Sequence, residues 1–188
     1  MKYNPDVHHH RSIRLKGYDY SQAGAYFVTI CTQNRECLLG DAVDGEMRLN
    51  EMGKTIMACW QRIPEHFRDI EIDEFIVMPN HVHGIIVINH NVGAQFIAPD
   101  RTNASLQGNQ GVINQGVMNH APTVGNIVRA FKVRCAYTIN RTHNTSGITL
   151  WQRNYYEHII HDETEMNKIQ EYIINNPLNW EMDENYKK

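Results

Sequence analysis

Apolar, aromatic and β-branched residues gather in three runs in the first half of the chain, at residues 25–32, 70–78 and 81–88. Each run is short and rich in the residue types that favour strands. The second and third runs meet at Pro79-Asn80, a pair typical of a tight turn. The pattern therefore predicts three strands, of which the last two are consecutive and joined by a turn.

Apolar residues recur at helical spacing in three other segments: residues 50–67, residues 123–141 and a last segment that ends before Pro177. A residue type that favours the N-cap stands at the start of each predicted helix: Asn50, Thr123 and Asp162. Pro177 ends the last helix, because the residue before a proline is disfavoured in the α region.

The chain also has a hairpin signal at Asp44-Gly45, leading into residues 46–49, and a strand-like stretch over residues 148–160. The order of predicted elements is then β, α, β, β, α, β, α. This order is typical of a ferredoxin-like α+β fold, an antiparallel sheet with helices packed on it. Residues 89–120, dominated by Asn, Gln and Gly, are predicted to form a flexible insertion in a single domain over residues 1–188.

The composition is that of an ordinary globular protein. Hydrophobic residues make up 41% of the chain and charged residues 21%, so wholesale disorder is not expected. No apolar run approaches the roughly 20 residues that span a bilayer, and the charged, His-rich start is not expected to be a signal peptide. We therefore expect no membrane association. Four cysteines without a CxxC pair predict reduced thiols in a cytoplasmic protein.

The net charge of −3 hides an uneven distribution. No carboxylate lies between Asp100 and Glu157, whereas several cations do: Arg129, Lys132, Arg134, Arg141 and Arg153. The N-terminal segment adds Lys2, Arg11, Arg14 and Lys16. A phosphate-binding surface needs local positive potential rather than a basic total. Both segments are therefore candidate nucleic-acid contacts, although ordinary solvated charge would give the same pattern.

Two histidines, in the sequence His81-Val-His83, lie inside the third predicted strand. Alternate residues of a strand point to the same face, with Cβ atoms roughly 6–7 Å apart. Two imidazoles placed in this way can hold one divalent cation and leave further positions for substrate and water. Two polar residues on an exposed face would give the same pattern, so this spacing alone does not establish a metal site.

Tyr172 and Asn176 are four residues apart in the last predicted helix, so one helical face presents both side chains. A phenol can act as a covalent nucleophile toward phosphorus when a metal polarises the phosphate. The side-chain oxygen of Asn is a suitable hard ligand for Mg²⁺ or Mn²⁺. Tyr172 also stands among apolar residues, so a core aromatic with an exposed hydroxyl is the alternative interpretation.

Four stretches together resemble the HUH single-strand DNA nucleases, and among them the REP-associated tyrosine transposases. They read Arg-Ser-Ile-Arg-Leu at 11–15, Val-Met-Pro-Asn-His-Val-His-Gly at 77–84, Trp-Gln-Arg-Asn-Tyr-Tyr-Glu-His at 151–158 and Tyr-Ile-Ile-Asn-Asn-Pro at 172–177. The resemblance covers nearly the whole chain apart from the Asn/Gln-rich segment and the last few residues. Each stretch is weak alone, and their joint occurrence is what is specific to the family.

The resemblance implies an HUH endonuclease fold and a transposase that cuts and transfers single-stranded DNA beside a hairpin. In this family pattern His81, His83 and Asn176 would bind Mg²⁺ or Mn²⁺. Tyr172 would be the nucleophile, forming a 5′-phosphotyrosine with the cut strand and freeing a 3′-hydroxyl. The expected partner is hairpin-bearing single-stranded DNA at the nucleoid, and the chain would act as a monomer or a homodimer.

The candidate DNA contacts come from the basic segments and from the motif at 151–158: Arg11, Arg14, Arg129, Lys132, Arg134, Arg153, Tyr156 and His158. Tyr155 and Tyr156 are rival nucleophiles, but they lie in a predicted strand without a partner at helical spacing, so packing or base stacking is expected of them. His158 could equally be a structural histidine. His161 stands where the family often has arginine, which would weaken a contact to the DNA backbone.

Two other functions fit the same residues. A domesticated, catalytically silent protein of this fold would bind DNA hairpins and form no covalent adduct with any divalent metal. The presence of all four proposed active-site residues argues against that interpretation. A small metal-dependent hydrolase acting on another class of substrate would bind no DNA hairpin.

Overall fold

The computed structural model describes residues 22–89, 122–142, 147 and 149–186. Beyond Asn89, the predicted insertion at 89–120 lies outside the described residues. The elements are, in chain order, β1 (Gly24–Cys31), η1 (Gln33–Arg35), β2 (Gly40–Val43), β3 (Glu46–Leu49), α1 (Glu51–Gln61), α2 (Ile63–His66), β4 (Ile70–Val77), β5 (His81–Ile88), α3 (Val124–Thr142), β6 (Tyr156–Ile160), α4 (Glu163–Asn175) and η2 (Trp180–Met182).

Four strands form one sheet in the order β4-β5-β1-β6, and every neighbouring pair is antiparallel. With one helical segment between β1 and β4 and another between β5 and β6, this is the ferredoxin-like arrangement. β2 and β3 form a separate two-stranded hairpin. Asp44 and Gly45, both with positive φ, lie at its turn. The predicted α+β fold with an antiparallel sheet is confirmed.

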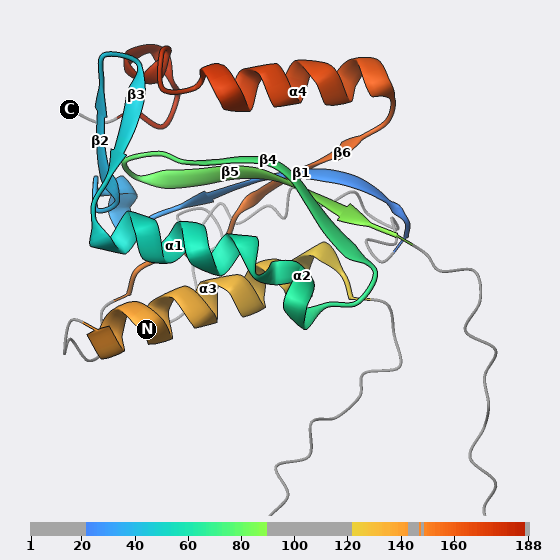
Figure 1. Ribbon diagram of the computed structural model, residues 1–188, viewed down its shortest axis with the longest axis horizontal. Helices are drawn as coiled ribbons and strands as arrows, with labels where there is room; N and C mark the ends of the chain where they lie inside the picture. The colour runs from blue at the N-terminus through green and yellow to red at the C-terminus, as the bar shows by residue number, and fades with distance from the viewer. Residues whose placement is uncertain (1–21, 90–121, 143–146, 148, 187–188) are drawn as a thin grey trace, which may run out of the picture.

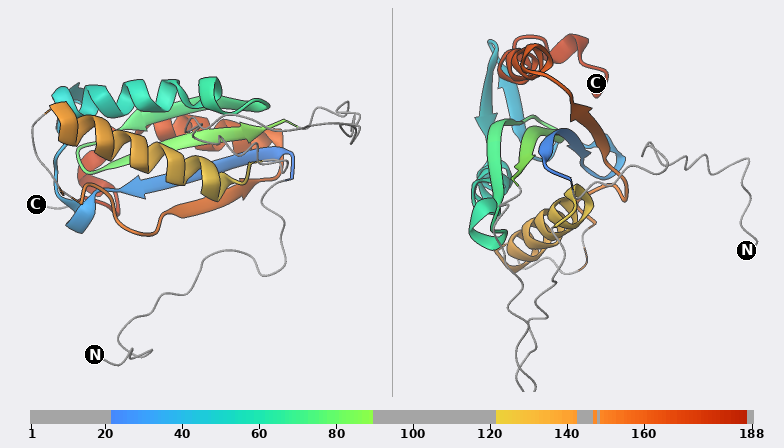
Figure 2. Two further views of the ribbon diagram at one scale, coloured as in Figure 1. Left: turned by 90° about the horizontal axis from the view of Figure 1, so that it is seen from below. Right: turned by 90° about the vertical axis from the view of Figure 1, so that its right-hand side faces the viewer.

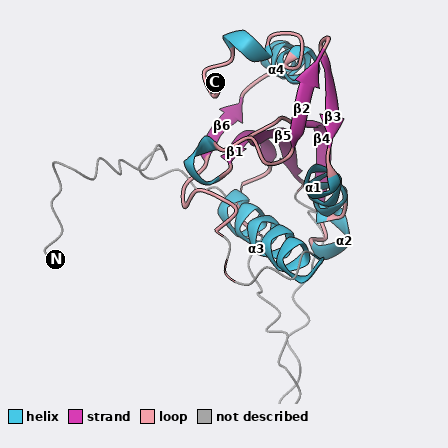
Figure 3. Ribbon diagram, turned by 90° about the vertical axis from the view of Figure 1, so that its left-hand side faces the viewer, coloured by secondary structure: helices cyan, strands magenta, loops and turns pink. Residues whose placement is uncertain are grey.

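Helices cover both faces of the sheet (Figure 1). The helices α1, α2 and α3 lie on one face, whereas α4 lies on the other, followed by the C-terminal residues. Figures 2 and 3 show the same three layers from other sides, with the sheet between the two groups of helices. Side chains that lie between the sheet and α4 are therefore on the opposite side of the sheet from α3.

Alternation along β1 and β5 divides the core between these two faces. Even-numbered residues of the two strands belong to the larger cluster, which also contains residues of α1 and α3: Tyr26, Val28, Ile30, Val82 and Ile86. Odd-numbered residues face α4, where Phe27 and Ile85 join Ile173 in a smaller cluster. His81 and His83 are odd-numbered residues of β5, so they also face α4.

Gly84, next to His83, leaves room for the largest side chain of the core. A Cβ added at this position would lie 2.3 Å from Cζ2 of Trp60, and Trp60 is completely buried. The indole therefore packs directly on the backbone of β5, immediately behind the two histidines. A glycine is required here for this close approach rather than for an unusual backbone angle.

The predicted helix starts are confirmed by their hydrogen bonds. Asn50 accepts the N–H of Gly53 at 3.0 Å, Thr123 accepts the N–H of Asn126 at 3.2 Å, and Asp162 accepts the N–H of Glu165 at 2.8 Å. Each bond satisfies a donor that the first turn of a helix otherwise leaves unpaired. The strands predicted around Pro79-Asn80 are confirmed as β4 and β5.

Two predicted boundaries were wrong. The helix expected over 50–67 is two helices, because the chain bends at Arg62 and Pro64 lies in the first turn of α2, where a missing N–H is tolerated. The strand expected over 148–160 is regular only from Tyr156 onward. Before that point a single bridge joins Trp151 to Thr32. In the part of the chain that is described, no helix has the length and hydropathy needed to cross a membrane.

Candidate active site

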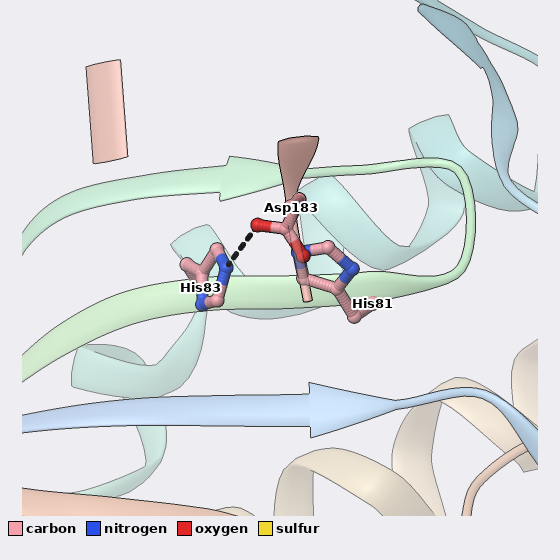
Figure 4. A group of neighbouring side chains, drawn as sticks. All are labelled: His81, His83 and Asp183. Carbon is pink, nitrogen blue, oxygen red and sulfur yellow. Dashed lines mark ion pairs between the residues drawn. The ribbon is translucent and has the colours of Figure 1, made fainter. Parts of the chain in front are cut away.

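Two neighbouring imidazoles lie on the α4 side of β5. His81 and His83 are 0% and 2% exposed, and their ring centroids are 4.3 Å apart. Figure 4 shows both beside the carboxylate of Asp183. Burial lowers the pKa of both imidazoles, because a buried ring is poorly solvated when it is charged. Both rings are therefore neutral at pH 7, which is the form that binds a metal.

The side chain of Asn80 determines which nitrogen of His81 carries the proton. The Asn80 amide nitrogen donates to the backbone oxygens of Arg35 and Asn185, at 3.2 and 2.8 Å. Its carbonyl oxygen is left to accept Nδ1–H of His81 at 2.8 Å. This tautomer puts a lone pair on Nε2 of His81, a buried nitrogen that has no hydrogen-bond partner within the described residues.

His83 is held by the neighbouring strand. Thr29 of β1 lies opposite His83 in the sheet, and its Oγ1 is 2.9 Å from Nδ1 of His83. The ring of Phe27 stacks on the imidazole with centroids 5.3 Å apart. A hydrogen bond to one ring nitrogen, with the other turned toward the site, is the usual arrangement of histidines that bind metals.

Tyr172, on α4, brings its hydroxyl to these imidazoles. The hydroxyl oxygen lies 3.3 Å from Nε2 of His83, and the hydroxyl donates to Oδ2 of Asp183 at 3.1 Å. The tyrosine remains 43% exposed. Burial of the hydroxyl and the nearby Asp183 carboxylate raise the pKa of Tyr172, so the resting side chain is a protonated phenol. The phenol of Tyr172 and the imidazole of His83, which the resemblance assigns to one active site, thus lie side by side in the structure.

Asn176, at the end of α4, also lies at this site. It is 1% exposed, and its Nδ2 donates to Oδ2 of Asp183 at 2.9 Å. Its Oδ1 is buried and has no partner among the described residues. Because Tyr172 and Asn176 are one helical turn apart, both reach the same carboxylate from α4.

Asp183 was missed by the sequence analysis. It follows η2, its side chain is 1% exposed, and its Oδ2 lies 3.9 Å from Nε2 of His83. Burial alone would raise the pKa of its carboxyl. The neighbouring imidazole of His83, together with hydrogen bonds from Asn176 and the N–H of Asn185, outweighs that effect and holds the pKa well below its usual range. The site therefore contains a buried, charged carboxylate.

A cleft of about 400 Å³ opens above these residues. His83, Tyr172 and Asn176 line it, and Phe27 and Tyr156 contribute aromatic surface. Tyr156 is 43% exposed, and its ring packs edge-on to Phe27 with centroids 6.2 Å apart. An accessible aromatic ring therefore lines the same cleft as Tyr172.

The donor atoms of the site fit a divalent cation. Ligand atoms of His81, His83 and Asp183 all lie within 4.8 Å of one another. Nε2 of His81 and Oδ1 of Asn176 are both buried without a partner among the described residues, although buried acceptors normally have one. A cation would satisfy both atoms. Imidazole, amide and carboxylate groups are ligands for Mg²⁺, Mn²⁺ and other first-row divalent metals.

Comparison with known proteins agrees with this fold. No protein-family model matches the chain. A protein of Haemophilus influenzae, described as uncharacterized, is 44% identical over 185 residues, covering 98% of this chain and 97% of that protein. The chain belongs to the same family as this Haemophilus influenzae protein.

One solved structure aligns with most of this chain. It is the REP-associated tyrosine transposase bound to a REP hairpin, which aligns with a TM-score of 0.54 and 17% sequence identity over 90% of this chain and 74% of that one. The chain has the fold of that transposase. The resemblance found in the sequence is therefore confirmed at the level of the fold.

Three of the predicted DNA contacts lie together, on the opposite side of the sheet from Tyr172. Arg129, Lys132 and Arg153 line a cleft of about 590 Å³ between α3 and the residues before β6. The ammonium of Lys132 donates to the backbone oxygens of Gln152 and Asn154, at 2.8 and 2.9 Å, and burial lowers its pKa to about 8. Lys132 is thus engaged in fixing this segment, whereas Arg129 and Arg153 are exposed.

The remaining predicted contacts are dispersed. Arg134 lines a different cleft, between α3 and the α1–α2 region. Nε2 of His158 lies 2.7 Å from Oε1 of Glu165, which is a structural pairing that ties β6 to α4. Arg11 and Arg14 lie outside the described residues.

The two rival tyrosines lie in different surroundings. Tyr155 lines the cleft beside α3, and its hydroxyl donates to Oε2 of Glu157 at 2.6 Å. Tyr156 instead lines the cleft that contains Tyr172. Tyr156 is therefore the matched control for substitutions of Tyr172.

Proposed function

We propose that this protein is a metal-dependent single-strand DNA endonuclease and strand transferase that acts beside a DNA hairpin through Tyr172. The observation that carries the proposal is the position of the Tyr172 hydroxyl, 3.3 Å from Nε2 of His83. A nucleophile, paired imidazoles and an unpartnered amide oxygen meet at one partly exposed cleft. The same fold occurs in a REP-associated tyrosine transposase that binds a REP hairpin.

The metal would be held by Nε2 of His81, Nε2 of His83 and Oδ1 of Asn176. When bound, Mg²⁺ or Mn²⁺ would polarise the scissile phosphate and offset the negative charge that develops during attack. The protein's own contribution is to fix these ligands before substrate arrives. Asn80 and Thr29 orient the two imidazoles, and the turn of α4 orients Asn176 beside Tyr172.

The chemical step is a transesterification. The phenolic oxygen of Tyr172 attacks the phosphorus, and the bond from phosphorus to the 3′-oxygen breaks. The DNA 5′-phosphate becomes linked to Tyr172, and the proton lost by the phenol is balanced by the proton that the 3′-oxygen gains. Because a phosphodiester is replaced by a phosphodiester, attack by a second 3′-hydroxyl can reverse the step and join a different strand without ATP.

The surroundings of Tyr172 suit an unpaired strand rather than a duplex. Base stacking on aromatic side chains is the usual means of holding single-stranded DNA. Tyr156 presents an exposed ring in the cleft, and we assign it the base next to the scissile phosphate. Arg129 and Arg153, beside α3, are assigned contacts to phosphates of the hairpin.

The proposal is tested by incubating the protein with labelled hairpin-bearing single strands and Mg²⁺ or Mn²⁺, then separating denatured protein on a gel. We expect a labelled protein–DNA adduct from the wild type and from Tyr156→Phe, and none from Tyr172→Phe. His81→Ala should abolish the adduct while leaving hairpin binding largely unchanged. An adduct that persists in Tyr172→Phe would refute the assignment of the nucleophile.

The outcome also separates the alternative functions. Specific hairpin binding with no adduct in either metal would identify a catalytically silent binding protein. Failure to bind any hairpin would favour a hydrolase that acts on another class of substrate. For the basic surface, Arg129→Ala should weaken binding and reduce the slope of log affinity against log salt by about 1.

A further inference from the structure

Asp183 is a buried carboxylate that has no lysine or arginine partner among the described residues. Its Oδ2 accepts hydrogen bonds from the Tyr172 hydroxyl and from Nδ2 of Asn176, and its Oδ1 accepts the N–H of Asn185 at 2.6 Å. Nε2 of His83, the nearest imidazole nitrogen, lies 3.9 Å from Oδ2, which is beyond hydrogen-bond distance. A charge removed from water to this extent is ordinarily paired with an opposite charge or bound to a metal.

The carboxylate lies at the distance that a shared metal ion would require. Metal bonds to nitrogen and oxygen ligands are about 2.0–2.2 Å long, so two ligands of one ion are separated by at most about 4.4 Å. Oδ2 of Asp183 and Nε2 of His83 are 3.9 Å apart. The cluster that includes His81 lies within 4.8 Å, close enough that a small adjustment of side chains brings all three to one ion.

The segment that carries Asp183 is held in place by contacts with β5 and with the turn before it. The ring of Trp180 lies against the imidazole of His81 with centroids 5.9 Å apart. Asn80, which fixes the tautomer of His81, also donates to the backbone oxygen of Asn185. The side chain of Asn80, in the turn before β5, thus forms hydrogen bonds with both His81 and the segment that carries Asp183.

We infer that Asp183 is a direct ligand of the catalytic metal, making the site a His81, His83, Asn176 and Asp183 set. The inference rests on the metal site of the proposed function and adds to it a ligand from a separate part of the chain. One consequence concerns the nucleophile. Oδ2 accepts the hydroxyl of Tyr172. If the same oxygen bound a cation, that hydrogen bond would be weakened and the phenol would be freer to turn toward the phosphate.

The experiment is titration of the full-length protein with Mn²⁺ alone, by calorimetry, without DNA. Asp183→Asn keeps the shape of the side chain and removes its charge, whereas Glu184→Gln removes the same charge from the next residue, which is exposed and lines the same cleft. We expect the Mn²⁺ affinity of Asp183→Asn to fall about tenfold or more. The affinity of Glu184→Gln should stay within about twofold of the wild type.

A second measurement distinguishes a ligand from a residue that only positions other ligands. Mn²⁺ favours six ligands, so four from the protein leave about two inner-sphere waters, which water-proton relaxation counts. We expect about two waters in the wild type and about three in Mn²⁺-saturated Asp183→Asn. An unchanged water count, about three waters in the wild type, or an affinity loss of less than threefold in Asp183→Asn would each overturn the inference.

These results are independent of the DNA reaction. If the wild type forms the Tyr172 adduct and Asp183→Asn binds Mn²⁺ normally, only the assignment of Asp183 fails. If Asp183→Asn loses Mn²⁺ as expected and the wild type forms no adduct, the metal site stands and the nuclease function fails.

Discussion

Replacement of Asn80 by alanine tests whether the hydrogen bond from His81 to Asn80 supports the proposed metal site. Asn80 is fully buried and makes three side-chain hydrogen bonds, to His81, Arg35 and Asn185. A buried hydrogen bond contributes about 1 kcal/mol net, so Asn80→Ala should lower the free energy of unfolding by about 3 kcal/mol. The imidazole of His81 would also lose the acceptor that keeps its proton on Nδ1, and Mn²⁺ affinity should fall about 10- to 100-fold.

Asn80→Asp separates these two effects. An aspartate at this position keeps an acceptor for Nδ1–H of His81, but it has no donor for the backbone oxygens of Arg35 and Asn185. We expect the free energy of unfolding to fall at least as far as in the alanine variant, while Mn²⁺ affinity is retained or increased.

Urea denaturation measures the stability of each variant, and calorimetric titration below the unfolding transition measures its Mn²⁺ affinity. If Asn80→Ala binds Mn²⁺ as tightly as the wild type, the tautomer of His81 is not controlled by Asn80. If Asn80→Asp loses as much affinity as Asn80→Ala, the loss comes from general destabilisation rather than from the hydrogen bond to His81.

Two further predictions concern the scaffold. In Gly84→Ala the new methyl group would meet Cζ2 of Trp60 at 2.3 Å, and overpacking of this kind should lower the free energy of unfolding by about 1–3 kcal/mol; an unchanged urea midpoint would contradict the close approach. Hydrogen bonds from the N–H of His161 and from His158 lower the pKa of Glu165. Its carboxylate therefore stabilises the fold above the ordinary glutamate pKa and loses this effect as the pH falls through the lower folded value. Glu165→Gln should be less stable than the wild type at pH 7, and the difference should vanish as the pH falls below the lowered pKa of Glu165; a difference in midpoint that does not change on acidification would exclude the mechanism.

The parts of the fold that depend only on residues close together in the sequence could be predicted from it. The caps at Asn50 and Asp162 are decided by the residue and the turn that follows it. Alternation along β5 likewise put His81 and His83 on one face without knowledge of the rest of the chain. The break at Arg62 was missed because the apolar spacing continues through it, although Pro64 was a signal that favoured a boundary.

The complete site depends on contacts that no local pattern encodes. Asp183 lies in a segment with no motif, and its place beside His83 follows from the packing of Trp180 and from the bond between Asn80 and Asn185. The surroundings of Lys132 also depend on distant residues. Its position on a basic helix predicts a phosphate contact, and the helical pattern did not indicate that the segment before β6 supplies backbone acceptors for its ammonium.

Mass mapping of the DNA-linked peptide tests the central claim most directly. The wild-type protein is incubated with a hairpin-bearing single strand and Mn²⁺, digested with a protease and a nuclease, and sequenced by tandem mass spectrometry. The account predicts a nucleotide joined through its 5′-phosphate to the hydroxyl oxygen of Tyr172. A nucleotide on Tyr155 or Tyr156, or cleavage of the strand with no covalent peptide at all, would contradict it.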